Sequence, residues 1–296
     1  MRKGNFKILE SFEHFSPGWK GVLKLFLWMM VGAVIGNVIT FVLGIFFGTE
    51  WVSSYGTVIA YPIMFIPPMF YARRRSMMRE HLEANPLNKG VFKPYGAPLC
   101  ALLVAGLTIA AGYIADPVVT LLPDMPEFLE QALESMVSGN VLINLLCVSV
   151  FAPFFEEWLC RGMVLRGLLA RNVKPVWAIL FSAFFFAFIH LNPWQALPAF
   201  ILGVIFGIVY YKTGSLKLTM LMHFVNNTFS AVLSRIDALK DFDCFAEVMD
   251  PAAYWSIFAV CVVAVVAICL IFLRIPVKDG QRSNCDIVPA ADWSKE

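Results

Sequence analysis

Glutamate, arginine and histidine residues inside apolar segments are the residues of this sequence best suited to chemistry. They occur in three stretches, FFEEWLCRG (154–162), FFFAFIHLNPW (184–194) and MHFVNNTF (222–229). A charged side chain in the hydrocarbon region of a membrane costs at least about 2.5 kcal/mol on insertion scales. Charged residues that are kept there usually face a cavity or a bundle interior and serve a function. The three stretches therefore predict one polar site within an apolar protein.

The first stretch contains a carboxylate that could act as a base. Glu157 and Arg161 are four residues apart with the acid nearer the N-terminus, which is the favourable order for an ion pair on a helix. Glu156 is then left without a partner beside aromatic neighbours, and partial desolvation is expected to make it a stronger base. In the alternative interpretation, both acids only neutralise Arg161.

Two histidines on other segments could complete such a site. His190 follows a run of phenylalanines and is expected to lie within a helical span at residues 176–191. His223 and Asn227 are four residues apart, so they share one face of a second helix. A single histidine in a membrane is more often a helix-packing donor than a catalyst. Two histidines on separate segments, with an amide one turn from the second, favour a catalytic cluster.

The rest of the sequence indicates the surroundings of this cluster. Hydrophobic residues make up 59% of the 296 residues and charged residues 15%, and the mean hydropathy is +0.72. This is more apolar surface than a water-soluble domain can bury, so we predict an all-α, polytopic membrane helix bundle. A net charge of +2 gives no indication of nucleic-acid binding. The seven cysteines include no CxxC pair, which argues against a zinc ribbon.

Apolar windows and basic loops predict the topology of the bundle. Eight windows of about 20 residues could cross a bilayer, and they cover residues 22–47, 54–71, 97–122, 141–169, 176–191, 196–211, 216–233 and 253–273. The second and fifth windows are short or interrupted, so seven or nine spans are also compatible with the sequence. Lys and Arg gather in every second loop, which predicts that both termini are cytoplasmic.

We therefore expect three segments in a multi-pass protein of the cell membrane. These are a cytoplasmic N-terminal segment (1–21), a single transmembrane domain (22–273) with its core at 140–233, and a cytoplasmic polar tail (274–296).

The motifs occur in a fixed order along the chain: Glu156-Glu157-x-x-x-Arg161, then Phe186-x-x-x-His190, then His223-x-x-x-Asn227. In this order, on successive apolar spans, they resemble the CAAX protease and bacteriocin-processing (Abi or CPBP) family. Its members are intramembrane endopeptidases related to the Rce1-type prenyl-protein protease. The resemblance covers about residues 140–233 and implies a glutamic peptide hydrolase without a serine or cysteine nucleophile.

Peptide hydrolysis needs a base, a proton donor and oxyanion donors that converge on one carbonyl group. By motif position, Glu156 with His190 would activate the attacking water, and His223 with Asn227 would stabilise the oxyanion. Three further residues would support this set, namely Glu157, Arg161 and Phe186. The implied partners are membrane lipids and a peptide or membrane-protein substrate, with a prenylated substrate as one option. The resemblance implies no cofactor.

Two other interpretations use the same residues. The carboxylates and histidines could hold a zinc ion that activates the water, although the sequence has no HExxH motif and no two histidines share a helix at ligand spacing. The cluster could instead belong to a transporter relay, or to a non-catalytic immunity or scaffold protein. Polar residues confined to one half of the chain argue against a transporter built from paired repeats.

Overall fold

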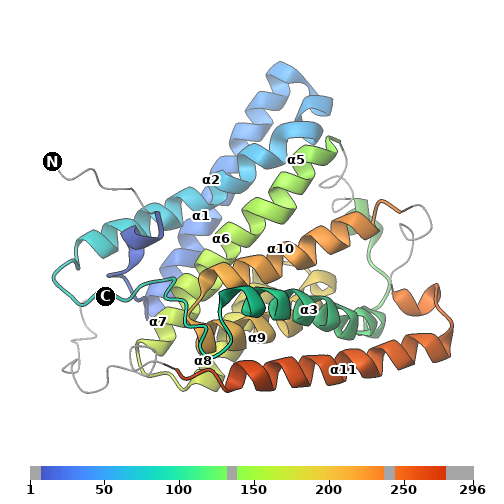
Figure 1. Cartoon of the computed structure of the whole chain (residues 1–296). Coiled ribbons are helices and arrows are strands. Elements are labelled where there is room, and N and C mark those ends of the chain that lie inside the picture. The colour runs from blue at the N-terminus through green and yellow to red at the C-terminus, as the bar shows by residue number, and fades with distance from the viewer. Residues whose placement is uncertain (1–7, 132–138, 237–243, 278–296) are drawn as a thin grey trace.

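The computed structural model describes residues 8–131, 139–236 and 244–277, which form helices joined by turns and contain no strand. The predicted all-α class is therefore confirmed. The α-helices are α1 (Trp19–Phe47), α2 (Thr49–Met77), α3 (Ala97–Ala115), α5 (Val141–Leu146), α6 (Ala152–Glu157), α7 (Arg166–Leu169), α8 (Pro175–Phe188), α9 (Pro193–Thr213), α10 (Leu216–Leu233) and α11 (Pro251–Leu273). Short 3-10 helices cover Ile8–Phe12 (η1), Asp116–Leu121 (η2) and Phe245–Glu247 (η5). In Figure 1, α1, α2 and the α5–α7 segment run side by side, whereas α3, α9, α10 and α11 lie across them.

Five helical segments among the described residues are long and apolar enough to cross a membrane. They are Trp19–Phe47, Ala97–Leu121, Val141–Leu169, Pro193–Thr213 and Pro251–Leu273. The protein is therefore a polytopic membrane bundle, and five of the eight predicted spans are accounted for. The other three windows also form helices, but α8 has only 14 residues, or about 21 Å. The count of eight spans and the orientation of the termini stay predictions.

Helices α1 and α2 form a hairpin with closely packed backbones. The second window was expected to be short or interrupted, but α2 is one helix of 29 residues that includes three prolines. Membrane helices tolerate proline where a neighbouring element supports the backbone, and α1 packs along α2. A Cβ at Gly36 of α1 would lie 2.9 Å from the carbonyl oxygen of Ala60, and one at Gly32 would collide with the carbonyl group of Met64. Small residues on α1 thus set the position of α2.

The helix that carries both glutamates is irregular. Two π-helical stretches, η3 (Cys147–Phe151) and η4 (Trp158–Leu165), flank the α-helical turn α6. Single π turns recur at functional sites in helices. The irregularity therefore coincides with the residues that the sequence singles out for chemistry.

A proline leaves one carbonyl of η3 without its backbone donor. The N–H of Ala152 donates to the carbonyl of Cys147, five residues earlier, as π-helical spacing requires. The next donor in this spacing would belong to residue 153, which is proline and has no N–H. The carbonyl of Val148 therefore needs a donor from outside this helix.

Helices α8 and α9 form a tight hairpin with His190 in its turn. His190 was expected inside a helical span at 176–191, but α8 ends at Phe188 and His190 follows in the turn. The cause is the proline at 193, because the residue before a proline is driven out of the helical region. That residue, Asn192, is extended at φ −145° and ψ 143°. Its side chain caps α9 by accepting from the N–H of Gln195 at 2.9 Å.

The residues before α1 pack into the protein. Phe12 and Phe15 are each 2% exposed. The buried guanidinium of Arg166 donates to the carbonyl oxygens of Phe15, Asn85 and Gly162. It thereby ties the N-terminal segment and the α2–α3 loop to the end of the glutamate-bearing helix. The remainder of the predicted N-terminal segment (1–7) and most of the predicted polar tail (278–296) lie outside the described residues.

Candidate active site

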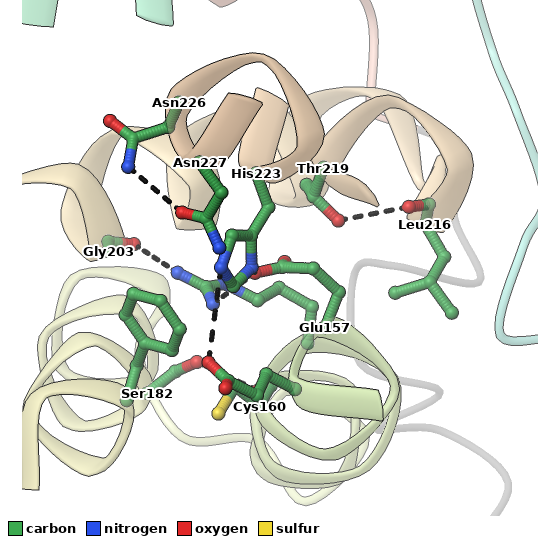
Figure 2. Close-up of polar contacts among 12 residues, drawn as sticks. Glu157, Cys160, Ser182, Gly203, Leu216, Thr219, His223, Asn226 and Asn227 are labelled. Atoms are coloured by element: carbon green, nitrogen blue, oxygen red, sulfur yellow. Dashed lines mark hydrogen bonds and ion pairs between the residues drawn. The ribbon is translucent and has the colours of Figure 1, made fainter. Parts of the chain in front are cut away.

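A buried ion pair forms the base of the site. Arg161 Nη1 lies 2.8 Å from Glu157 Oε1, so the ion pair predicted from their spacing is confirmed. Both side chains are 0% exposed. Arg161 Nη2 also donates to the carbonyl oxygen of Gly203 in α9 at 3.0 Å (Figure 2). The guanidinium carbon lies 4.6 Å from the ring centroid of Phe186 and 5.3 Å from that of Phe206. Removing one member of such a pair leaves the other charge uncompensated, at a cost of about 3–5 kcal/mol.

His223 of α10 connects this ion pair to the second glutamate. Its Nδ1 lies 3.2 Å from Glu157 Oε1, and Figure 2 shows the imidazole pointing from α10 toward Glu157. Because a carboxylate accepts hydrogen bonds, Nδ1 carries the hydrogen in this contact. The other ring nitrogen, Nε2, faces Glu156 Oε2 at 4.0 Å. This distance is too long for a direct hydrogen bond, but one oxygen atom between the two groups could contact both.

The prediction that Glu156 has no partner is wrong. The hydroxyl of Tyr61 in α2 donates a hydrogen bond to Glu156 Oε1. The other oxygen, Oε2, is buried and forms no hydrogen bond within the described residues. The side chain as a whole is 13% exposed. Glu156 is thus anchored through Oε1 by Tyr61, a residue from a distant segment of the chain. Its Oε2 is left to contact another group.

Phe186 of α8 lies between the two histidines. Its ring centroid is 5.1 Å from that of His190 and 5.4 Å from that of His223, and both contacts are edge-on. His190 Nδ1 is 2.8 Å from the carbonyl oxygen of Phe186, so Nδ1 carries the hydrogen and Nε2 is the acceptor of the neutral ring. The expected partnership of His190 with Glu156 is not a direct contact, since His190 forms no ion pair in the described part of the chain. His223 faces Glu156 instead.

Asn227 supplies the donor that the Val148 carbonyl of η3 lacks. Its Nδ2 donates to Val148 O at 2.9 Å. Asn226 Nδ2 donates to Asn227 Oδ1 at 3.1 Å, so both ends of the Asn227 amide are held (Figure 2). One Nδ2 hydrogen is used in the bond to Val148, and the second hydrogen remains for another acceptor. Pro153 removes the backbone donor, and Asn227 replaces it with a side-chain donor. This bond fixes α10 against the glutamate-bearing helix.

The second π stretch is fixed in a similar way. Ser182 of α8 donates to the carbonyl oxygen of Cys160 at 2.8 Å, as Figure 2 shows. Both Cys160 and Ser182 are fully buried. Helices α8 and α10 therefore each bond to a backbone carbonyl of a π stretch, on the two sides of the glutamates.

The arrangement of donors does not fit a zinc ion. Zinc sites usually need at least three side chains that converge on one point. In residues 8–131, 139–236 and 244–277, no group of three or more His, Cys, Asp or Glu side chains could hold a metal ion. His223 presents different ring nitrogens to the two glutamates, and Glu157 is already bound to Arg161.

Most of the predicted residues lie together, and some contacts could not be foreseen. Glu156, Glu157, Arg161, Phe186 and His223 are linked by direct contacts. His190 contacts this group through Phe186. Asn227 bonds to the glutamate-bearing helix at Val148, in the π stretch that precedes the glutamates. Sequence reasoning missed Tyr61, whose signal was a hydroxyl within an apolar window. It also missed Asn226, which directly precedes a chosen residue.

Comparison with known proteins agrees with the order of these motifs. Residues 138–229 match the family model described as type II CAAX prenyl endopeptidase, Rce1-like. No curated protein and no solved structure matches the chain. The matched segment contains both glutamates, both histidines of the site and Asn227. Residues 138–229 are therefore similar to the Rce1-like type II CAAX prenyl endopeptidases, and this segment lies within an integral membrane helix bundle.

Proposed function

We propose that this protein is an intramembrane endopeptidase in which Glu156 acts as the general base on the attacking water. One observation carries the proposal. Glu156 is held through Oε1 by Tyr61, while its buried Oε2 lacks a hydrogen-bond partner among the described residues and faces His223 Nε2 across 4.0 Å. A water at this position would donate to the carboxylate and contact the imidazole at the same time, as general-base activation of water requires.

The remaining residues have complementary roles in the proposed reaction. Glu156 takes a proton from water as its oxygen attacks the carbonyl carbon of the substrate. In its cationic form His223 carries hydrogens on both ring nitrogens, and Nε2 then donates to the oxyanion together with the second Nδ2 hydrogen of Asn227. Stabilising the oxyanion is the role that removes the most free energy from such barriers. The C–N bond then breaks, and the leaving amine receives a proton through Glu156 and His190 Nε2. Glu157, itself paired with Arg161, accepts from His223 Nδ1 and thereby orients the imidazole ring and balances its charge.

The substrate class follows from the family and the environment. We propose a membrane-bound protein or peptide with a prenylated C-terminal Cys-aliphatic-aliphatic-X box, cleaved at the cell membrane. Aromatic side chains adjoin the site residues, because Phe154 and Phe155 precede Glu156 and the ring of Phe186 contacts His190; these apolar neighbours support a substrate that carries a lipid chain. The reaction consumes one water and yields a new carboxylate and a free amine, without an oxidant, a reductant or a cofactor.

A fluorogenic peptide assay tests the proposal. The probe is a farnesylated peptide ending in a Cys-aliphatic-aliphatic-X box, with a fluorophore and a quencher on opposite sides of the scissile bond. We expect the parent protein in detergent micelles to cleave it and Glu156→Gln to lose at least about 10²-fold in kcat, as general-base removal does. Glu50→Gln, which alters an exposed carboxylate at the start of α2, is the matched control and should retain the parent rate.

Three outcomes would contradict the proposal. Absence of cleavage by the parent protein would favour a non-catalytic immunity or scaffold role. Equal rates for Glu156→Gln and the parent would remove Glu156 from the chemistry. Dialysis against a strong zinc chelator should leave the rate unchanged, and a loss that added zinc reverses would establish the metal-dependent alternative instead.

A further inference from the structure

The contact between Tyr61 and Glu156 joins a part of the chain outside the family-matching segment to a residue inside it. Tyr61 lies in α2, outside the segment that matches the family model. Its hydroxyl donates to Glu156 Oε1 and makes no other hydrogen bond in the described residues. Tyr61 is half-buried, and its hydroxyl is directed at the carboxylate that the proposed function uses as the base.

We propose that Tyr61 is a positioning residue for the hydrolysis, acting through Glu156. This inference rests on the proposed function. A hydroxyl that donates to a carboxylate selects one rotamer of the acid and engages one of its two oxygens. With Oε1 engaged by Tyr61, Oε2 is the oxygen directed toward His223 Nε2. Tyr61 thus decides which oxygen of Glu156 meets the water, and from which direction.

The ring of Tyr61 is held independently of its hydroxyl. Its centroid lies 5.6 Å from that of Phe65 and 6.5 Å from that of Phe155, which precedes Glu156. Phe65 in turn stacks on Phe155 at 5.0 Å. These aromatic contacts fix α2 against the glutamate-bearing helix, so removal of the hydroxyl alone should leave the packing in place.

The position of α2 is set by its partner helix. The close approach of α1 at Gly32 and Gly36 leaves no space for a shift of α2 toward α1. The hydroxyl of Tyr61 is therefore presented by a rigid hairpin rather than by a mobile loop, which suits a group that must hold a base within a fraction of an ångström. The N-terminal half of the chain thereby contributes a side chain to the site.

The test compares Tyr61→Phe with the parent on the farnesylated peptide probe, with Tyr55→Phe as the matched control. Tyr55 lies on the same helix, its ring centroid is 5.4 Å from that of Trp51 in a tilted arrangement, and the residue is 37% exposed. Tyr61→Phe should lower kcat by about 10- to 100-fold, the equivalent of one hydrogen bond to a charged acceptor, and change KM by less than about twofold. Tyr55→Phe should keep the parent kcat and KM.

The outcomes separate this inference from the proposed function. If Glu156→Gln is inactive and Tyr61→Phe keeps the parent kcat, the positioning role is refuted and the proposed function stands. If Glu156→Gln keeps the parent rate, both are refuted. A Tyr61→Phe defect that appears in KM, or together with a lowered thermal unfolding midpoint, would show a packing role instead. A loss in kcat alone, with an unchanged midpoint, supports positioning.

Discussion

Replacing Pro153 by alanine should damage activity without damaging stability. Proline in a helix interior costs about 3 kcal/mol relative to alanine, so an alanine at this position suits the helix better. Alanine also supplies the N–H that can donate to Val148 O in π-helical spacing. The same carbonyl accepts from Asn227 Nδ2 at 2.9 Å in the parent protein. The new backbone donor would therefore compete with Asn227.

The expected loss in kcat follows from the free energy of the hydrogen bond between Asn227 Nδ2 and Val148 O. A typical intramolecular hydrogen bond contributes about 1 kcal/mol net. Weakening the restraint on Asn227 by that amount lowers the ratio of its held to its released orientation about fivefold. If Asn227 donates to the oxyanion, kcat should fall by up to this factor. The unfolding free energy should stay equal to that of the parent or rise by about 1 kcal/mol.

Two measurements check this reasoning on the same purified variant. Cleavage of the farnesylated peptide probe gives kcat, and unfolding in a series of SDS concentrations gives stability. Asn227→Ala sets the lower limit, with an expected loss of about 10²- to 10³-fold in kcat for one oxyanion donor. Pro198→Ala, at another proline inside a helix, is the control and should leave kcat unchanged. A Pro153→Ala variant with the parent kcat would refute the idea that Pro153 keeps the Val148 carbonyl available to Asn227.

Three further predictions concern the ion pair, the hairpin and a thiol outside the spans. Arg161→Met should lower the unfolding free energy by about 3–5 kcal/mol, and adding Glu157→Gln should recover most of that loss in SDS unfolding; additive losses would contradict a coupled pair. Gly32→Ala should lower the thermal midpoint because its Cβ meets the backbone of α2, whereas Gly106→Ala, with open space around it, should not; equal midpoints would contradict close helix packing. Burial, then a hydrogen bond to a carboxylate, raises the pKa of the Cys244 thiol above its ordinary value of 9.0, so its stabilising contribution is complete below that value and is lost as pH rises through the raised pKa. As the pH rises above 9.0, the unfolding free energy should therefore fall more steeply in the parent than in Cys244→Ala, and equal slopes would oppose this.

The sequence predicts interactions that depend on spacing within one helix. The Glu157–Arg161 pair follows from two residues four positions apart, and it is present even though part of that helix is π-helical. The all-α class follows from composition, because a chain this apolar must satisfy its backbone internally in lipid. The gathering of the polar residues into one cluster follows from the cost of isolated charges in a membrane, but the particular contact of His223 with Glu157 does not.

Contacts between distant segments and departures from regular geometry could not be predicted. Tyr61 lies 95 residues before Glu156, and nothing in its apolar window indicates which helix it faces. His190 was placed in a helix because its apolar run continues to Leu191, while the proline two residues further on ends α8 earlier. The two π stretches are too short for the spacing of apolar residues to reveal them. Pro153, which follows η3 and lacks an N–H, is a local signal for one of them.

The buried guanidinium of Arg166 bears on how this protein could be divided or grafted. Two of its acceptors, the carbonyls of Phe15 and Asn85, lie far outside the family-matching segment 138–229. A fragment limited to that segment would lack these acceptors for an arginine that is 4% exposed in the whole protein, and leaving such a group unpaired in a dry interior costs several kcal/mol. Transplanting the segment into another membrane scaffold would meet the same penalty unless the host offered carbonyl groups at the same places. The candidate site motifs all lie within that one segment of the sequence, but the structure that supports them includes residues before the first long helix.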